Sequence, residues 1–232
     1  MTIETETSNY SAEEELRDGR PVTIRAIHGE DKSLWKEIWE HMSPTSVYYR
    51  FFTPKKAISE QEVAYFTELD FVTHVGLIAL VHNPYMPNAD PAAAARYHVS
   101  EKRPDSAEIA FGVEDMYHGL GLGTLLLKHL AIIARQAGIK QFKAYVLTEN
   151  SKMLEVFEHC GLPMTKAISD FTMWEVTLDL TQSILELTQS TIEKAQSALD
   201  LTRSTVNQAQ SALDLTHTNL LPSPESEHES SS

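Results

Sequence analysis

Three glycines at alternate positions mark a segment of this chain where an anion could bind. They are Gly119, Gly121 and Gly123, and they lie between an expected strand and an expected helix that begins at Thr124. Glycine lets the backbone turn tightly and approach a ligand closely. The free N–H groups and the positive dipole end of a helix N-terminus attract negative charge. The spacing therefore predicts an anion-binding loop, and a glycine-rich turn without a ligand is the alternative.

Two familiar nucleotide-binding loops do not fit this segment. A dinucleotide fingerprint has its third glycine three residues after the second, where Thr124 stands here. It also needs an acidic residue about 20 positions further on, a region that falls inside the expected helix at Gln136. A Walker A loop needs Gly-Lys-Ser/Thr, which this segment lacks.

Strands and helices are expected to alternate over residues 14–180, and they would hold the loop in place. Strands are expected at 16–26, 74–81, 94–99, 107–113, 142–147 and 171–180. Helices are expected at 31–42, 59–69, 124–137 and 151–159, with a further helical turn starting at Pro44. Ser59 and Glu62 form a capping box, and the apolar run 74–81 indicates a strand buried on both faces. This mixture predicts one α/β or α+β domain.

Composition narrows the class of protein. The 232 residues carry a formal net charge of −14 without a basic stripe, so nucleic acid is not an expected partner. The longest apolar runs are far shorter than the roughly 20 residues that span a membrane, so no membrane association is expected. The ten histidines lack metal-ligand spacing, and no metal is expected. The single cysteine, Cys160, and the acidic N-terminus favour a cytoplasmic location.

The C-terminal residues follow a different pattern. The segment 196–202 recurs as 210–216, a repeat of two heptads. Counting by sevens from Leu178 gives an unbroken series of large apolar residues, with a small residue four positions before each later member, as in a coiled coil. The series is Leu185, Ile192, Leu199, Val206, Leu213 and Leu220. Residues 181–220 are therefore expected to form a heptad-repeat helix that self-associates, packs on its own domain or binds a partner. A solvated low-complexity tail is the alternative. Disorder is expected for residues 1–13 and 221–232.

The strand, glycine loop and long helix, followed by residues 148–162, resemble the GNAT superfamily of acetyl-CoA-dependent N-acyltransferases. The pyrophosphate loop of that family is usually Gln/Arg-x-x-Gly-x-Gly/Ala, and His118 takes its first position here. A second cofactor motif of the family is matched by Asn150, Met153, Phe157 and Gly161. Upstream, residues 16–22 and 43–52 are similar to the acetyltransferase domain of bacterial Pat-type protein-lysine acetyltransferases. The resemblance covers about residues 14–180.

The resemblance implies a GNAT fold, a mixed central sheet with two splayed strands flanked by helices, and acetyl-CoA as co-substrate. It implies that the pantetheine arm pairs with the backbone of Phe111, Gly112 and Val113. It places the diphosphate on His118, Gly119, Leu120, Gly121, Leu122, Gly123 and Thr124. Asn150 would bond the amide arm of the cofactor, or simply cap the helix that follows it. Phe157 would contact the cofactor.

Glu108 is the expected general base. Its segment, 107–111, resembles the strand that carries the catalytic glutamate in related enzymes, and alternation places Glu108 on one face with Ala110 and Gly112. A lysine amine has a pKa of about 10.4, so a base or water relay must take its proton before attack. The alternative for Glu108 is a cross-strand salt bridge at the end of the sheet.

Phe157 stands where many family members have a tyrosine that protonates the departing CoA thiolate. A thiol pKa of about 8.5 makes that thiolate a tolerable leaving group, so an acid helps without being essential. Ser151 or Tyr145 could take this role. The expected function is acetyl transfer to a primary amine, a protein lysine among the candidates, by direct attack in a ternary complex. The alternative is an idle GNAT domain that senses acetyl-CoA and presents its tail to a partner.

Overall fold

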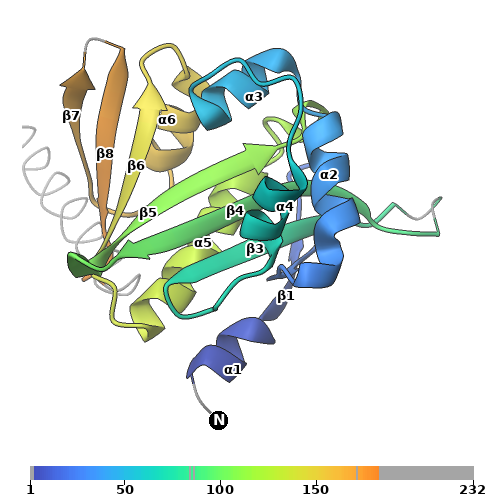
Figure 1. The fold of residues 1–232 in the computed structure, drawn as a ribbon, viewed down its shortest axis with the longest axis horizontal. Helices are drawn as coiled ribbons and strands as arrows, with labels where there is room; N and C mark the ends of the chain where they lie inside the picture. The colour runs from blue at the N-terminus through green and yellow to red at the C-terminus, as the bar shows by residue number, and fades with distance from the viewer. Residues whose placement is uncertain (1–2, 84, 86, 171, 183–232) are drawn as a thin grey trace, which may run out of the picture. The chain divides into compact units, whose positions relative to one another are not determined.

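One eight-stranded sheet runs through the computed structural model, which describes residues 3–83, 85, 87–170 and 172–182 (Figure 1). The strand order is β1-β2-β3-β4-β5-β6-β8-β7. The strands are β1 (Ser11–Glu15), β2 (Pro21–Ala26), β3 (His74–Val81), β4 (Asp90–Ser100), β5 (Arg103–Val113), β6 (Gln141–Leu147), β7 (Met164–Asp170) and β8 (Met173–Asp179). Neighbouring strands are antiparallel except β5 and β6, which are parallel. The sheet is therefore mixed, as expected.

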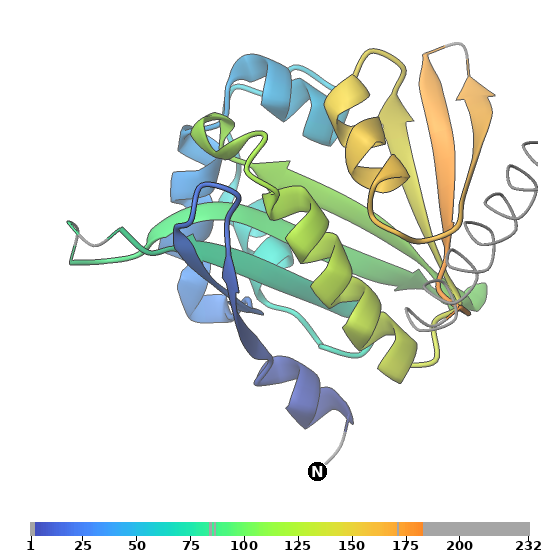
Figure 2. The ribbon, with the colours of Figure 1, turned by 180° about the vertical axis from the view of Figure 1, so that it is seen from behind.

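Helices cover both faces of this sheet (Figures 1 and 2). The helical segments are α1 (Ile3–Ser8), η1 (Gly29–Asp31), α2 (Lys32–Glu40), α3 (Pro44–Phe51), α4 (Glu60–Thr67), η2 (Asp115–Tyr117), α5 (Leu122–Gln136) and α6 (Ser151–Glu158). Figure 2 shows α5 and α6 in front of the sheet, and Figure 1 shows α2 and α4 in front of its other face. None of the helices within the described ranges is long and apolar enough to cross a membrane.

Two clusters of buried apolar side chains lie on the two faces. Leu77 of β3 and Leu126 of α5 belong to the larger cluster. Ile78, the next residue of β3, belongs to the smaller cluster with Trp35 of α2 and Phe66 of α4, whose rings stack at 4.7 Å. The strand predicted to be buried on both faces is therefore confirmed in β3.

Local capping signals begin two of these helices where the sequence places them. Ser59 caps α4, and Glu62 returns the hydrogen bond, so the predicted capping box is confirmed. Ser43 caps α3, with Pro44 in the first turn, where a missing N–H costs nothing. The start of α3 is thus fixed by two adjacent residues, and the side chains that follow project from a defined helix.

The expectation of disorder over residues 1–13 is wrong for the part that the structure describes. α1 occupies Ile3–Ser8, and β1 pairs with β2. Tyr10 Oη lies 2.5 Å from His129 Nδ1 of α5, and Glu14 accepts hydrogen bonds from Lys128 and His129. These contacts join residues more than a hundred positions apart, so the polar sequence of the N-terminus alone does not predict that it is ordered.

The last expected strand, 171–180, is also only partly right. It corresponds to β8, and a second strand, β7, precedes it at the sheet edge with mostly exposed, polar residues. Leu178, the first residue of the predicted heptad series, is a fully buried residue of β8 and not part of a helix. The chain divides into two units, Met1–Ser183 and Ile184–Ser232. The rest of the expected heptad helix, and residues 221–232, lie outside the described residues.

Candidate active site

The parallel strands β5 and β6 begin as neighbours and then separate (Figure 1). They pair over three register positions, from Ser106↔Gln141 to Glu108↔Lys143. Beyond that point β5 stays paired with β4 up to Val113, and β6 with β8. The edge of β5 that turns toward β6 therefore has main-chain groups without a strand partner. Main-chain N–H and C=O groups inside a protein need hydrogen bonds, so this edge can pair with an extended ligand. The expected splay of two central strands is confirmed.

A cavity of about 830 Å³ lies at this opening. Its lining comes from α3, β5, the glycine loop, the start of α5, β6 and α6. This volume falls in the range of small-molecule and cofactor sites. Most of the predicted site residues line it, namely Glu108, Phe111, Gly112, Val113, His118, Gly119, Gly121, Leu122, Gly123, Thr124, Asn150 and Phe157. Leu120 does not: its side chain packs against the larger core cluster, and its carbonyl accepts the N–H of Arg17 at 3.1 Å.

The loop wall of the cavity, residues 118–124, is shaped by left-handed glycines. Gly119 has φ +79°, with open space where a side chain would be. Gly121, with φ +94°, caps α5, which begins at Leu122 and so two residues earlier than expected. The N-cap has no side chain to bond the free N–H groups of the first turn. A diphosphate fits this arrangement because, among the described residues, no acidic side chain competes for those donors at the cap or in the first turn.

Gly123 serves packing rather than ligand approach. A Cβ added there would lie 3.3 Å from Cγ2 of Val156 on α6, which is tighter than an ordinary contact. The third glycine therefore lets α5 and α6 approach each other, whereas Gly119 and Gly121 give the loop its backbone conformation.

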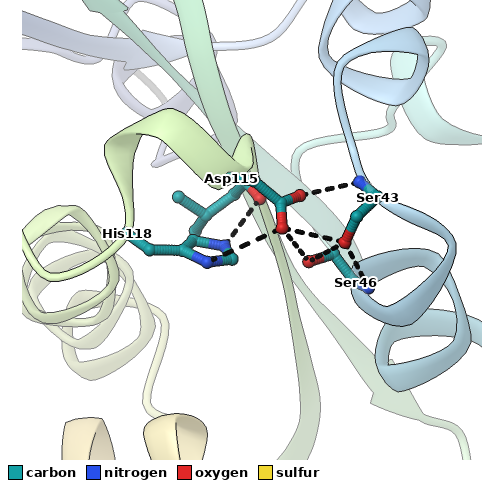
Figure 3. A network of polar contacts seen from close by, with 5 residues as sticks. Ser43, Ser46, Asp115 and His118 are labelled. Carbon is teal, nitrogen blue, oxygen red and sulfur yellow. Dashed lines mark hydrogen bonds and ion pairs between the residues drawn. The ribbon is translucent and has the colours of Figure 1, made fainter.

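Asp115, in η2, connects the loop wall to α3 (Figure 3). Its carboxylate accepts hydrogen bonds from Ser43 N at 2.7 Å, Ser43 Oγ at 2.8 Å and Ser46 Oγ at 3.0 Å. His118 Nδ1 lies 4.0 Å from the same carboxylate, and His118 Nε2 donates to the carbonyl of Val113 at 3.1 Å. Burial raises the pKa of Asp115, but the hydrogen bonds from Ser43 and Ser46 outweigh it and hold the pKa below its usual value. Both ring nitrogens of His118 thus face protein groups.

Glu108 lies at the last pairing position of β5 with β6 and lines the cavity. Its register partner across this pairing, Lys143, forms an ion pair with Glu175 instead. Its neighbour on β4 is His98. Among the described residues Glu108 has no ion-pair partner, so the alternative of a cross-strand salt bridge is not formed there. Glu108 is therefore an exposed carboxylate beside the opening.

Arg50 of α3 adds a cation to the same wall as Glu108. It is half-buried and lines the cavity, and its guanidinium lies 5.0 Å from the ring centroid of Phe51 and 5.7 Å from that of Phe66. Arg96 of β4 lies 4.8 Å from the same Phe66 ring. Burial, followed by the like charge of Arg96, lowers the pKa of Arg50 to about 9, while the charge of Glu108 acts in the opposite direction. We call the polar and charged side chains on this side of the cavity, Ser43, Ser46, Tyr49, Arg50 and Glu108, the α3–β5 wall.

The far side of the cavity contains Asn150 and Phe157. Asn150 caps α6, with Oδ1 accepting the N–H of Met153 at 3.2 Å, so the capping interpretation is confirmed. Asn150 also lines the cavity, and its amide NH₂ group has no hydrogen-bond partner among the described residues. Phe157 is buried and meets Phe111 edge-on at 6.1 Å, and it has no proton to donate. Tyr145 and Ser151 also line the cavity, which keeps both as candidates for an acid.

Several residues of the cavity carry no local signal in the sequence. Arg17 and Arg50 line it, and Asp115 links two of its walls, but no motif in the sequence predicts any of them as a site residue. Ser43 could have been found as a helix cap before a proline, although not its contact with Asp115, 72 positions away. Only the folded chain brings these side chains together.

The mixed sheet, the separation of β5 from β6 and the cavity between them define the class of protein as an acyltransferase. The chain belongs to the acetyltransferase (GNAT) family, whose sequence pattern matches residues 32–162. The fold of this family uses acetyl-CoA as the acetyl donor. The family resemblance noted in the sequence is thereby confirmed.

Relatives are acetyltransferases as well. The chain is 28% identical over 143 residues to acetyltransferase PA5475 of Pseudomonas aeruginosa, covering 62% of this chain and 75% of that one. It is 28% identical over 134 residues to acetyltransferase Pat of Mycolicibacterium smegmatis, covering 58% of this chain and 39% of Pat. This chain thus spans less than half of Pat.

Solved structures agree on the fold. The GNAT domain of S. lividans PAT matches with a TM-score of 0.65 and 34% identity, over 73% of this chain and 96% of that domain. The protein yncA from Salmonella typhimurium, solved with its cofactor acetyl-CoA, matches with a TM-score of 0.55 and 17% identity, over 70% of this chain and 95% of that one. At that identity, the second match supports the fold alone.

Proposed function

We propose that residues 14–180 catalyse acetyl transfer from acetyl-CoA to a primary amine, by direct attack within a ternary complex. The observation that carries this proposal is the position of Glu108. Its carboxylate has no ion-pair partner among the described residues, and it lies where the cavity opens between β5 and β6. A base at this point can serve an amine that enters beside α3.

The cofactor would be held mainly by main-chain groups. The unpaired edge of β5 at Phe111, Gly112 and Val113 offers N–H and C=O groups to an extended amide-bearing arm. The loop wall offers its N–H groups and the positive end of the α5 dipole to the diphosphate. The Asn150 amide adds a donor on the opposite side.

Glu108 would accept the proton that the amine must lose. Bound acetyl-CoA supplies an acetyl thioester, whose carbonyl carbon is open to attack by a neutral amine. An ammonium group with a pKa of about 10.4 is protonated near neutral pH, so a positioned carboxylate accelerates the reaction. Phe157 cannot return a proton to the departing sulfur. Tyr145 and Ser151, two of the hydroxyl-bearing residues that line the cavity, are our candidates for this acid.

A protein lysine is our proposed acceptor class. Two of the relatives are Pat-type acetyltransferases, and the net charge of −14 favours the approach of basic acceptors by electrostatic steering. Self-association through residues 181–220 is a separate proposal, because the described residues that line the cavity lie between Arg17 and His159.

CoA release tests the function directly. The full chain is given acetyl-CoA with a panel of amines: free amino acids, lysine peptides and a folded lysine-bearing protein. Binding of CoA is followed in parallel by thermal shift. Turnover with any amine supports the proposal, and its pattern identifies the acceptor. Binding of CoA without turnover on the whole panel would instead favour the sensor alternative.

A further inference from the structure

Arg17 lies between β1 and β2, next to the loop wall. Its neighbour Leu16 is 2% exposed and anchors this hairpin in the core. The N–H of Arg17 donates to the carbonyl of Leu120 at 3.1 Å, and its Nη1 donates to the carbonyl of Gly119 at 3.2 Å. The hairpin thus holds one arginine side chain on a loop that lies about a hundred positions further along the chain.

The side chain of Arg17 packs on the loop glycine that caps α5. A Cβ added at Gly121 would lie 3.5 Å from Arg17 Cγ and 3.6 Å from Arg17 Nε. Arg17, Gly119 and Gly121 all line the cavity. The guanidinium therefore lies next to the loop wall, on the side of the loop that faces the cavity.

The charge of Arg17 has no protein counterion in the described part of the chain. Its neighbours Asp18 and Arg20 pair with each other at 2.8 Å, and Arg17 enters no ion pair. A guanidinium carries five N–H donors in a planar fork, and here one of them is used on Gly119. The remaining donors match the geometry of a phosphate group, which arginine can bind through two parallel hydrogen bonds.

We propose that Arg17 binds the diphosphate of CoA, adding a side-chain cation to a site otherwise made of main-chain donors. This assignment rests on the proposed use of acetyl-CoA. It makes Arg17 a specificity residue that selects phosphorylated acyl donors over the bare pantetheine thioester. The bond to Gly119 orients the fork, and the packing on Gly121 limits its movement, so little side-chain freedom is lost when the phosphate binds.

Three ligands separate the phosphates of the cofactor: CoA, 3′-dephospho-CoA, which keeps the diphosphate, and S-acetylpantetheine, which has no phosphate. Calorimetry gives the affinity for the first two, and amine-dependent turnover gives kcat/KM for the third. Arg17→Gln keeps a donor for the Gly119 carbonyl but loses the charge. It should weaken CoA and 3′-dephospho-CoA alike by about 10- to 100-fold. The kcat/KM for S-acetylpantetheine should stay at the wild-type value.

Two further variants control for loop structure and overall charge. Arg17→Lys keeps the charge without the fork and should lose only part of the affinity. Arg103→Gln removes a cation at the opposite, exposed end of β5 and should change nothing.

Other outcomes would overturn the assignment. A loss that extends to S-acetylpantetheine would mean that Arg17 only shapes the loop. A loss confined to CoA would place Arg17 on the 3′-phosphate. Unchanged CoA affinity in Arg17→Gln would remove it from the site. Wild-type protein that binds neither CoA nor 3′-dephospho-CoA would overturn the proposed function, and this assignment with it.

Discussion

The loop wall and the α3–β5 wall enclose the same cavity with different kinds of atoms. The loop wall, residues 118–124, offers main-chain N–H groups arranged by Gly119 and Gly121. The α3–β5 wall offers side chains, Arg50 and Glu108 among them, whose charges act on each other across the cavity lining. A main-chain site suits a ligand part that is the same in every reaction. Side chains can be exchanged singly, so the α3–β5 wall is the one that can specify the acceptor.

The largest expected effect comes from the α3–β5 wall. Glu108→Gln keeps the shape of the side chain and removes the base, so kcat should fall by about 10²- to 10⁴-fold at neutral pH. CoA affinity should stay the same, because the loop wall is untouched. Part of the rate should return at high pH, where the amine loses its proton to solvent. The matched control is Glu101→Gln, in the turn between β4 and β5. Wild-type activity in Glu108→Gln would remove this residue from the mechanism.

The complementary change belongs to the loop wall. Gly121→Asp places a carboxylate among the donors proposed for the diphosphate and forces a non-glycine residue to φ +94°. CoA affinity should fall by at least about 100-fold, from the loss of two charge-assisted hydrogen bonds. Gly138→Asp is the control, because Gly138 also has a positive φ, +79°, with open space around it, but lies outside the cavity lining. If both variants lose the same amount of CoA affinity, backbone strain, and not the anion site, explains the loss.

A smaller effect is expected where the two walls meet. Asp115→Ala removes the acceptor of three hydrogen bonds from Ser43 and Ser46 at the start of α3. Small displacements of positioning elements lower catalytic efficiency, so kcat/KM for the amine should fall about 10-fold. CoA affinity should change less than about threefold. Asp115→Asn, which keeps one oxygen acceptor, should be intermediate. If CoA affinity falls as far as amine efficiency, Asp115 serves the loop wall rather than α3.

The smallest effect concerns the stability of the fold, and it comes from a buried histidine, His74. His74 of β3 contacts Arg96 of β4, with Nε2 3.1 Å from the guanidinium, and Arg96 shares the Phe66 ring with Arg50. Burial, then the charges of Arg96 and His98, lowers the pKa of His74 from 6.5 to about 4. The unfolded chain therefore binds a proton to His74 at a higher pH than the folded chain does. The free energy of unfolding should fall as pH drops from about 6.5 toward 4, by on the order of 2 kcal/mol between about pH 7 and pH 5.

Urea denaturation at those two pH values measures this term. His74→Gln should remove that part of the loss, whereas His159→Gln, at an exposed histidine after α6, should keep it. The same acid loss in wild type and His74→Gln would show that other groups cause it.

The two walls also differ in how much of their structure could be predicted from the sequence. Left-handed turns need glycine, and helix starts need caps, so the glycine loop, the cap at Ser59 and the cap at Asn150 were all readable locally. The apolar run of β3 was readable because both of its faces are buried. These features depend on a few neighbouring residues.

The unpredicted features depend on distant ones. α1 and β1 are held by contacts of Tyr10 and Glu14 with α5, and β7 is a polar edge strand that has no apolar alternation to detect. Arg17 reaches the loop across 102 positions, and Asp115 reaches Ser43 across 72. No local pattern encodes such pairs, because only the packing of the sheet and helices sets their distance. Glu108 was found through family resemblance and strand alternation, but its freedom from an ion pair depends on Glu175 taking Lys143.

The separation of β5 from β6 determines which substitutions the strand can accept during evolution. The hydrogen-bonding groups along the free edge of β5 belong to the peptide chain, so they persist whichever side chains residues 109–113 carry. Proline is the exception, because it has no N–H to offer. Substitutions on this strand can therefore remodel the width and polarity of the cavity while its edge keeps the ability to pair with an extended ligand. The shape of the site can therefore change during evolution while the proposed pairing of β5 with the acetyl donor is kept.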